Sequence, residues 1–372
     1  MALYIGLMSG TSLDGVDGVL LDIDDSTGRI ASIRDHRHEA FEGALRDELL
    51  TLNRPAGVDE LHRAATASSA LARAYASVVG RLLNDCSTAT TDVSAIGAHG
   101  QTVRHCPQAS AGGYTLQLLN GALLAELTGI DVVCDLRSRD VAAGGQGAPL
   151  APGFHAAVFG APNEARLVLN LGGIANLTLL SPGKPVIGFD CGPANALLDG
   201  WCARHRATPY DADGAWGATG TVIHGLLQRL LAEPYFDATP PKSTGRDRFH
   251  LDWLDAHLAA EENSAAPVDV QATLAALAVE SVARDVERHA PDATVVYVCG
   301  GGARNGDLMR RLADRLPALR VTSTAELGVP VDQVEAAAFA WLAHRFVQRL
   351  PGNLPEVTGA AGLRILGALH PA

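Results

Sequence analysis

The sequence predicts an α/β fold made of two similar halves. Segments with strand character alternate with helical segments along the 372 residues, which is the pattern of an α/β protein. A glycine-rich hairpin opens each half, which indicates a duplicated architecture with a nucleotide held in the cleft between the halves. Hydrophobic residues make up 47% of the chain, enough to bury a large core in two domains. We expect an N-terminal domain over 1–164, joined by 351–372, and a C-terminal domain over 165–350.

The first hairpin is predicted by two apolar runs, 3–8 and 19–23, around a polar tip. The tip consists of Gly10, Thr11, Ser12, Leu13, Asp14, Gly15, Val16 and Asp17. Its glycines let the backbone approach a ligand closely, its amides and hydroxyls suit phosphate oxygens, and its carboxylates suit Mg²⁺ and the waters bound to it. The alternative interpretation is that Asp14-Gly15 forms only a hairpin turn.

The rest of the first half is predicted from hydrophobic periodicity. Residues 29–41 have the character of a third strand, and the Ala- and Leu-rich stretch 58–83 has that of a helix. The remaining predictions for this half are a short strand over 95–98, a helix over 120–128, a strand over 132–134 and a glycine-rich loop over 137–152.

The second half opens on the hairpin 166–180, whose tip carries Gly172 and Gly173. The irregular stretch 234–248, rich in Pro, Asp, Lys and Arg, is typical of a long functional loop. The other predicted elements are a strand over 186–189, helices starting near 193 and 219, a helix over 271–289, a strand over 294–298, a helix over 305–316 and a last helix over 331–350 that Pro351 ends.

Asp190 follows an apolar strand directly, at the carboxyl end where open α/β sheets place their ligands. Pro193 suits the first position of the next helix, so Gly192 would be the N-cap and Asp190 would not be needed for capping. The pattern makes Asp190 the best candidate for a general base, with an ordinary turn aspartate as the alternative.

Glu335 is a second candidate carboxylate, in the last predicted helix. Its neighbours at helical spacing, Val331, Phe339 and Leu342, are apolar, which predicts a side chain facing the interior. A lone carboxylate is costly there, which favours a role in an active site. The alternative is a capping box formed by residues 332–335.

Six sequence motifs, in order along the whole chain, resemble those of the anhydro-N-acetylmuramic acid kinase family. They are GLMSGTSLDGVD at 6–17, GQT at 100–102, NLGGIAN at 170–176, GFDCGPAN at 188–195, CGGGARN at 299–305 and VEA at 334–336. Because six separate motifs match, the resemblance is highly specific.

The resemblance implies the superfamily of acetate and sugar kinases, heat-shock chaperones and actin. Such proteins have a two-domain architecture with a duplicated ribonuclease H-like core and the active site in the interdomain cleft. The resemblance also implies a bacterial peptidoglycan-recycling enzyme. This enzyme would use ATP and water to open 1,6-anhydro-N-acetylmuramic acid and phosphorylate its 6-oxygen, which gives N-acetylmuramic acid 6-phosphate.

The resemblance assigns roles to the motif residues. Asp190 would activate the attacking water, Glu335 would orient water, sugar or metal, and both hairpin tips would bind the phosphates of ATP. Mg²⁺ would be held through water by Asp14 or Asp190. The adenosine of ATP would bind at Gly300, Gly301, Gly302 and Asn305. A dinucleotide site is the weaker alternative there, because the third glycine is out of register for G-x-G-x-x-G.

The sugar contacts are predicted from polar residues that follow a strand and from arginines in a glycine-rich loop, because a guanidinium suits the lactyl carboxylate. These residues are His99, Gln101, Thr102, Arg137 and Arg139. Loop arginines that are simply solvated are the alternative. Another polar group, Lys242, Thr244, Arg246 and Arg248, would either close over the phosphates or form an ordinary surface loop.

Composition narrows the class of partner. The formal charge of −12, with no basic block, argues against nucleic acid. No apolar run approaches the ~20 residues of a membrane helix, and the N-terminus lacks a signal-peptide pattern. The six cysteines form no C-x-x-C pair, which suits a reducing compartment. We expect a cytoplasmic homodimer that binds ATP and a small sugar.

Two other functions stay open. One is a kinase for another anhydrosugar such as levoglucosan, which lacks the lactyl and acetamido groups. The other is an actin-like or chaperone-like ATPase, since one fold serves many functions. A chaperone would need a peptide-binding domain, for which this chain has no spare length.

Overall fold

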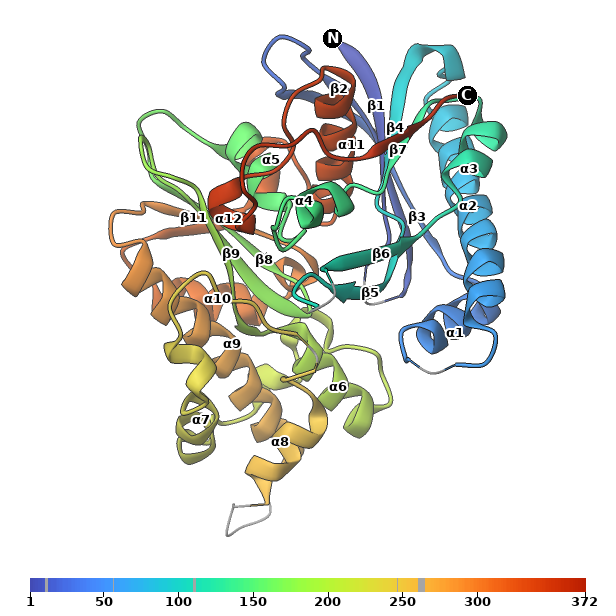
Figure 1. Ribbon diagram of the computed structural model, residues 1–372. Coiled ribbons are helices and arrows are strands. Elements are labelled where there is room, and N and C mark those ends of the chain that lie inside the picture. The colour runs from blue at the N-terminus through green and yellow to red at the C-terminus, as the bar shows by residue number, and fades with distance from the viewer. Residues whose placement is uncertain (11–12, 56, 110–111, 246, 260–264) are drawn as a thin grey trace. The chain divides into compact units, whose positions relative to one another are not determined.

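The computed structural model describes every residue except 11–12, 56, 110–111, 246 and 260–264, and it divides into two compact units (Figure 1). The first unit comprises residues 1–158 and 333–372, and the second comprises residues 159–332. The domain boundaries predicted from the sequence lie after 164 and after 350 instead. The main difference is the helix α11 (Val334–Val347), which packs on strands β1, β2 and β4 of the first unit.

The first unit is built on a six-stranded sheet of order β13-β7-β4-β1-β2-β3. Strands β1, β2 and β3 form an antiparallel meander, β4 and β7 add in parallel beside β1, and β13 pairs antiparallel with β7. The bounds are β1 (Ala2–Met8), β2 (Gly15–Ile23), β3 (Ile30–Ala40), β4 (Val93–Ala98), β7 (Val132–Cys134) and β13 (Ala368–His370). A separate two-stranded sheet joins β5 (Gln101–Cys106) to β6 (Tyr114–Leu118).

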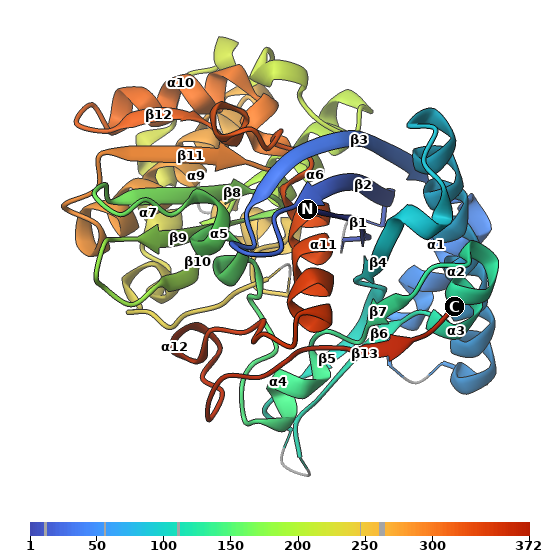
Figure 2. The ribbon, with the colours of Figure 1, turned by 90° about the horizontal axis from the view of Figure 1, so that it is seen from above.

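Helices cover both faces of the larger sheet, which explains why β1 and the second half of β2 are almost continuously apolar. A Cβ on Gly6 of β1 would overlap the carbonyl of Ala336 in α11, whereas a Cβ on Gly18 of β2 would overlap Val78 in α2. Gly18 lies opposite Leu7, the neighbour of Gly6, so the two glycines point to opposite faces. The other helices here, several of them labelled in Figure 2, are α1 (Gly43–Leu52), α2 (Glu60–Asp85), α3 (Gly121–Thr128), α4 (Ser138–Ala142), α5 (Ala151–Phe159) and α12 (Pro355–Thr358).

The second unit repeats the strand order of the first. Its sheet has the order β10-β9-β8-β11-β12, with an antiparallel meander β8-β9-β10 and with β11 and β12 added in parallel beside β8. These strands are β8 (Arg166–Leu171), β9 (Ile174–Leu180), β10 (Ile187–Pro193), β11 (Val295–Cys299) and β12 (Arg320–Ser323). The same five positions hold β3-β2-β1-β4-β7 in the first unit. The predicted α/β fold with a duplicated ribonuclease H-like core is therefore confirmed.

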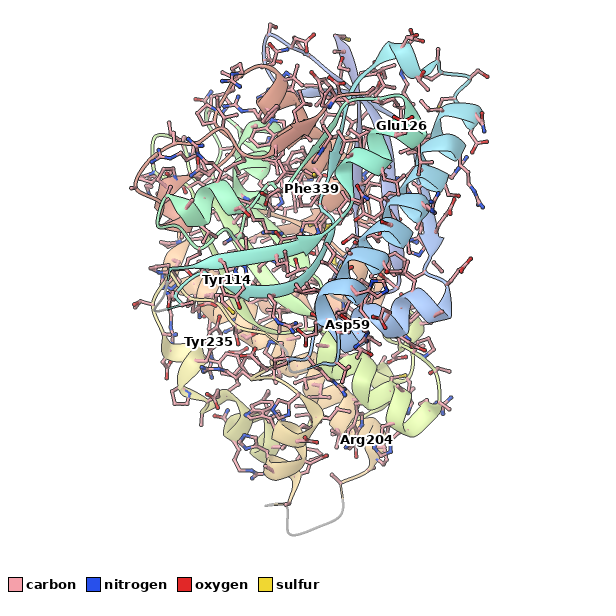
Figure 3. All side chains as sticks on the ribbon, turned by 45° about the vertical axis from the view of Figure 1, so that its right-hand side comes forward. Asp59, Tyr114, Glu126, Arg204, Tyr235 and Phe339 are labelled. Carbon is pink, nitrogen blue, oxygen red and sulfur yellow. The ribbon has the colours of Figure 1, made fainter. Side chains whose placement is uncertain are left out.

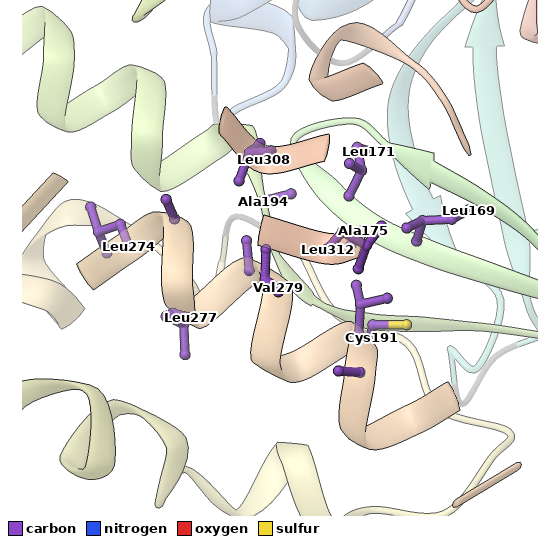
Figure 4. Close-up of a cluster of buried hydrophobic side chains, with 14 of the residues drawn as sticks. Leu169, Leu171, Ala175, Cys191, Ala194, Leu274, Leu277, Val279, Leu308 and Leu312 are labelled. Carbon is purple, nitrogen blue, oxygen red and sulfur yellow. The ribbon is translucent and has the colours of Figure 1, made fainter. Parts of the chain in front are cut away.

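The core of the second unit lies between its sheet and α9 (Pro267–His289), which packs on β9 and β10. Figure 4 shows side chains of this core from the strands and helices, among them Leu169, Ala175, Leu277 and Leu312. The other helices of the unit are α6 (Asn195–Arg206), α7 (His224–Leu231), α8 (Leu251–Leu258) and α10 (Gly306–Arg315). None of the helices in the described part of the chain is long and apolar enough to span a membrane.

Two local expectations are wrong. Strand β10 continues to Pro193 and α6 begins at Asn195, so Pro193 does not open the helix and Asp190 lies inside the strand. The pairing of β10 with β9 shifts register between Asp190 and Gly192, an irregularity of the kind that re-aims side chains beside active sites. In addition, α4 and the start of α5 fall within the region 137–152 that the sequence predicts as a loop.

Candidate active site

The tip of the first hairpin is fixed by its own turn and by the side chain of Gln101, the first residue of β5. The Gly10 carbonyl accepts hydrogen bonds from the Leu13 N–H (3.3 Å) and from Gln101 Nε2 (3.1 Å). The side chains of Leu13 and Val16 are buried in the core, so these two residues can offer a ligand only their backbone groups. Thr11 and Ser12 lie outside the described residues.

The other tip residues differ in what they can offer. Gly15 is needed for packing, because a Cβ there would overlap the carbonyl of Glu39 in β3. Asp17 Oδ1 lies 3.2 Å from His36 Nε2 and 3.1 Å from His38 Nδ1, so its carboxylate is engaged by β3. Asp14 is exposed, which leaves it the more accessible of the two carboxylates.

Next to the tip, the side chains of His99, Gln101 and Arg137 form a cluster that is hydrogen-bonded to the first hairpin. We call this cluster the bracket. The His99 ring donates from Nδ1 to the Ser9 carbonyl (3.0 Å) and packs on Phe339, which is labelled in Figure 3, with ring centroids 4.8 Å apart. Gly100, between them, has a φ of +75°, a conformation that favours glycine. Gln101 is buried, and its Oε1 has no hydrogen-bond partner among the described residues.

His99 also holds Arg137. Because Nδ1 carries the ring proton, Nε2 of His99 accepts from Arg137 Nε (3.2 Å) and Nη2 (3.0 Å). Arg137 Nη1 donates to the Gly147 carbonyl at 2.8 Å. Burial, together with the Arg137 charge, lowers the pKa of His99 to about 3, so the imidazole is neutral. Burial lowers the pKa of Arg137 to about 10, and the carboxylate of Glu335 opposes that shift.

Glu335 differs from its prediction. Its side chain is exposed rather than interior, although the residues on either side of it in α11 are buried. The N-cap of the helix is Gln333 rather than Asp332, and the Gln333 side chain makes no capping hydrogen bond. The electrostatic effect on Arg137 nevertheless links Glu335 to the His99 bracket.

Two predicted sugar contacts lie outside this bracket. Thr102 Oγ1 accepts from Gln117 Nε2 at 3.2 Å within the β5-β6 sheet. Arg139 is exposed on α4 and lines a different pocket, together with Arg349 and Arg364. The bracket therefore brings together His99, Gln101 and Arg137, but not Thr102 or Arg139.

In the second unit, Asp190 is half-buried and asymmetrically bonded. Its Oδ2 accepts hydrogen bonds from Ser243 Oγ and from the Thr244 N–H, both at 3.0 Å. Its Oδ1 accepts none from the described residues. Burial raises the pKa of Asp190 above its ordinary value. The hydrogen bonds from Thr244 and Ser243 and the charge of Lys242 lower this pKa and so make the rise smaller. One oxygen is thus anchored while the other is available to a water molecule.

A buried ion pair supports the loop that holds Asp190. Lys242 Nζ lies 3.0 Å from Asp285 Oδ1, and the two side chains are 3% and 2% exposed. The Lys242 carbonyl accepts from the Asp190 N–H, and the Lys242 ammonium lies 5.2 Å from the ring centroid of Tyr235. The Tyr235 hydroxyl donates to the Asp190 carbonyl at 2.7 Å. Because Lys242 is buried and paired, the alternative that it closes over phosphates is wrong; Arg246 lies outside the described residues.

The second hairpin and the 299–305 motif pack on one another. The carbonyls of Gly172 and Gly173 accept hydrogen bonds from backbone N–H groups at the start of α6. A Cβ on Gly300, which has a φ of +78°, would overlap the Asn170 side chain, and a Cβ on Gly302 would lie 2.5 Å from the Leu171 Cβ. Gly301 is exposed, with no heavy atom closer than 3.8 Å to such a Cβ.

Asn305 has a structural role that explains its position. Its side chain accepts from the Leu308 N–H at 3.0 Å and so caps α10. Within the described residues, no three His, Cys, Asp or Glu side chains form a group that could hold a metal ion. This is compatible with Mg²⁺, which usually binds through one or two carboxylates, several waters and the phosphates of the substrate.

Comparison with known proteins decides the family. The model of the anhydro-N-acetylmuramic acid kinase family matches residues 2–372. The chain belongs to this family. The anhydro-N-acetylmuramic acid kinase of Cupriavidus metallidurans is 56% identical over 99% of this chain and 97% of its own length, and that of Bordetella petrii is 58% identical over 100% and 96%. Among solved structures, component A of (R)-2-hydroxyglutaryl-CoA dehydratase from Acidaminococcus fermentans matches 92% of this chain and 99% of its own, with 14% identity and a TM-score of 0.49.

Membership in the anhydro-N-acetylmuramic acid kinase family makes the chain a phosphotransferase that acts on an amino sugar, and it confirms the predicted family and enzyme class. Sequence reasoning missed Ser243 as a partner of Asp190 and Asp285 as a partner of Lys242. Both partners are more than 40 positions away from the residue they contact, so no local pattern points to them. The polar content of 234–248 was the one available signal.

Proposed function

We propose that the enzyme opens 1,6-anhydro-N-acetylmuramic acid with water and transfers the γ-phosphoryl group of ATP to its 6-oxygen. Water attacks C1, the bond from C1 to the bridging 6-oxygen breaks, and that oxygen forms the new bond to phosphorus as ADP leaves. Asp190 takes the proton of the water, as a general base within hydrogen-bond reach would. The γ-phosphoryl group thus takes the place that the acid has in a glycosidase.

The observation that carries this proposal is the asymmetry of Asp190. Oδ2 is anchored by Ser243 and Thr244, whereas Oδ1 accepts no hydrogen bond from the described part of the chain. A carboxylate held by one oxygen keeps its orientation while the other oxygen binds water. Its raised pKa also makes its carboxylate a stronger base than that of an ordinary aspartate.

The nucleotide contacts follow from the same proposal. Gly10–Asp17 and Gly172–Gly173 would contact the phosphates, mainly through backbone N–H groups, and residues 300–302 and Asn305 would contact the adenosine. Mg²⁺ would neutralise charge on the transferring phosphates and would be held through water by Asp14 or Asp190. The exposure of Asp14 and Gly301 supports these two roles, because both are accessible to a ligand.

The sugar contacts are assigned to the bracket behind the first hairpin. Gln101 Oε1 is a buried acceptor without a partner among the described residues, which suits a hydroxyl or amide N–H of the substrate. Arg137 uses three of its five N–H donors on His99 and Gly147, so two stay available for the lactyl carboxylate. Glu335 would orient water, sugar or metal, and Thr102 and Arg139 are weaker candidates. We also propose that the enzyme acts as a homodimer in the cytoplasm.

The experiment is a product analysis with ATP, Mg²⁺ and the anhydro-sugar in ¹⁸O-labelled water. We expect label at C1 of the phosphorylated sugar and none in the phosphate. Label in the phosphate would contradict the mechanism. Levoglucosan assayed in parallel tests the rival substrate, and faster turnover of levoglucosan would overturn the assignment of the sugar.

A further inference from the structure

The first unit has a pocket that is not lined by His99, Gln101 or Arg137. It has a volume of 510 Å³, within the range of small-molecule sites. Three arginines line it: Arg139 from α4, Arg349 after the end of α11, and Arg364 in the segment before β13 (elements labelled in Figure 2). Phe346, Leu363 and Ile365 give it an apolar side.

The arginines of this pocket lack acidic partners. Most arginines of this acidic chain pair with carboxylates, as Arg34 does with Asp22 at 2.9 Å. Within the described residues, the side chains of Arg139, Arg349 and Arg364 form no ion pair, and Arg364 donates one hydrogen bond, to the carbonyl of its neighbour Leu363. Three like charges in one pocket repel each other, so an anion that neutralises them would bind favourably.

The backbone of Arg349 provides an independent observation. It has a φ of +58°, directly after the C-cap of α11, a position where glycine is the usual residue. A non-glycine residue pays a steric cost in this conformation, which makes an arginine side chain there an unexpected choice for stability alone.

The walls of the pocket are held together by a buried polar network. Asp140, next to Arg139, accepts hydrogen bonds from Asn353 Nδ2 (2.7 Å) and Thr358 Oγ1 (2.8 Å). Asn353 Oδ1 in turn accepts from the Arg364 N–H at 2.7 Å. This network ties the backbone that carries Arg364 to the helix that carries Arg139, so the pocket is preformed rather than assembled by its ligand.

We infer that this pocket binds a small organic phosphate, with the phosphate on the arginines and the organic body against Phe346 and Leu363. Guanidinium groups bind phosphate oxygens in bidentate fashion. The inference goes beyond the proposed function, because Arg139, a weaker candidate for a sugar contact, is the one residue given a role there that also lines the described pocket. Such a site would let a phosphorylated metabolite act on the enzyme from outside the reacting centre.

The test uses the full-length enzyme and titrates glucose 6-phosphate, inorganic phosphate and glucose by calorimetry. We expect glucose 6-phosphate to bind more tightly than either of its parts. Arg139→Ala combined with Arg364→Ala should weaken its binding at least tenfold. Arg349→Gly should also weaken the binding of glucose 6-phosphate, because the substitution removes a charge. The melting temperature should stay equal or rise, because glycine adopts the positive φ at this position without a steric cost.

Arg73→Ala is the matched control, since Arg73 is another exposed arginine of the first unit without a partner among the described residues, and it lies on α2. Binding should be unchanged in this variant. The inference fails if glucose 6-phosphate binds no better than glucose, or if the pocket variants and the control bind it equally. It also fails if the pocket variants change only the oligomeric state, because the arginines would then belong to a protein interface.

Discussion

At the scale of single residues, the chemistry of Asp190 depends on contacts that its own strand does not supply. Ser243 and Thr244 fix one carboxylate oxygen, and Tyr235 and the Lys242 carbonyl fix its backbone. Four contacts from the segment 235–244 therefore orient one side chain of β10. Such preorganisation is what a general base needs, because little reorientation then remains for the reaction itself.

Replacing Asp190 by Asn tests this role directly. The amide keeps the shape of the side chain but cannot accept a proton from water, so turnover should fall by roughly 10²- to 10⁴-fold. Calorimetry should find ATP and sugar bound with little change in affinity, and the melting temperature should stay near that of the wild type. Near-normal turnover would instead make Asp190 a structural residue and Glu335 the next candidate.

The buried Lys242–Asp285 pair predicts a pH effect. Burial raises the pKa of Asp190, and the charge of Lys242 lowers it. Removing the Lys242 ammonium should therefore raise the pKa of Asp190 further. The double variant Lys242→Met/Asp285→Asn leaves no unpaired buried charge. Because the base acts when ionised, activity is lost as pH falls through its pKa. The acid limb of kcat/KM should therefore move upward by about half a pH unit or more.

The matched control for this experiment is Lys184→Met/Asp292→Asn. That pair joins the same residue types at 3.1 Å in the second unit, but its side chains are 63% and 71% exposed. Its removal should leave the acid limb unchanged. If both double variants move the limb equally, net charge rather than the position of Lys242 sets the pH dependence.

At the scale of elements, hydrophobic periodicity predicted the long segments and those short ones that are strongly apolar. The third strand 29–41, the helix 58–83 and the strand 132–134 correspond to β3, α2 and β7 within a few residues. The β5-β6 hairpin was not predicted, because most of the residues of β5 are polar and its first residue, Gln101, pairs with Leu118, far along the chain. Short elements of this kind are stabilised by tertiary contacts rather than by their own sequence.

The residues of the candidate site were also predicted only in part. Gln101 comes shortly after the apolar strand β4, and Asp190 directly follows an apolar run within β10, so their positions could be predicted. The exposure of Glu335 could not, because apolar neighbours on a helix do not reveal which residues α11 turns towards β1 and which it leaves uncovered.

Two neighbouring glycines of the 299–305 motif, Gly300 and Gly301, should respond differently to replacement by alanine. Gly300→Ala should destabilise the second unit by about 1–3 kcal/mol, because it combines a positive φ with overlap of Asn170. Gly301→Ala meets only an ordinary van der Waals contact, 3.8 Å from Asn195 Nδ2, and should leave stability unchanged. If adenosine lies against this backbone, Gly301→Ala should weaken ATP binding in calorimetry. Unchanged ATP affinity would give the motif a purely structural role.

At the scale of the whole molecule, one chain forms two copies of the same five-strand arrangement. The two copies carry different candidate functional residues. The first carries the bracket of His99, Gln101 and Arg137, and the second carries Asp190 with its supporting loop. Each copy has its own hydrophobic core: one cluster uses residues from 167 to 316 and the other residues from 3 to 134. The second unit is also continuous in sequence, whereas the first is completed by residues 333–372.

This arrangement predicts how fragments of the chain behave. The segment 159–332 contains a complete sheet and core, so it should fold alone and melt cooperatively. The segment 1–158 lacks α11, ten of whose residues are buried, and the face of the sheet at Gly6 and Gly97 would be uncovered. It should therefore bind hydrophobic dyes and aggregate, and a peptide covering 333–372 should restore its structure. Calorimetry and dye fluorescence measure both effects, and a folded, dye-free 1–158 fragment would contradict the assignment of α11 to the first unit.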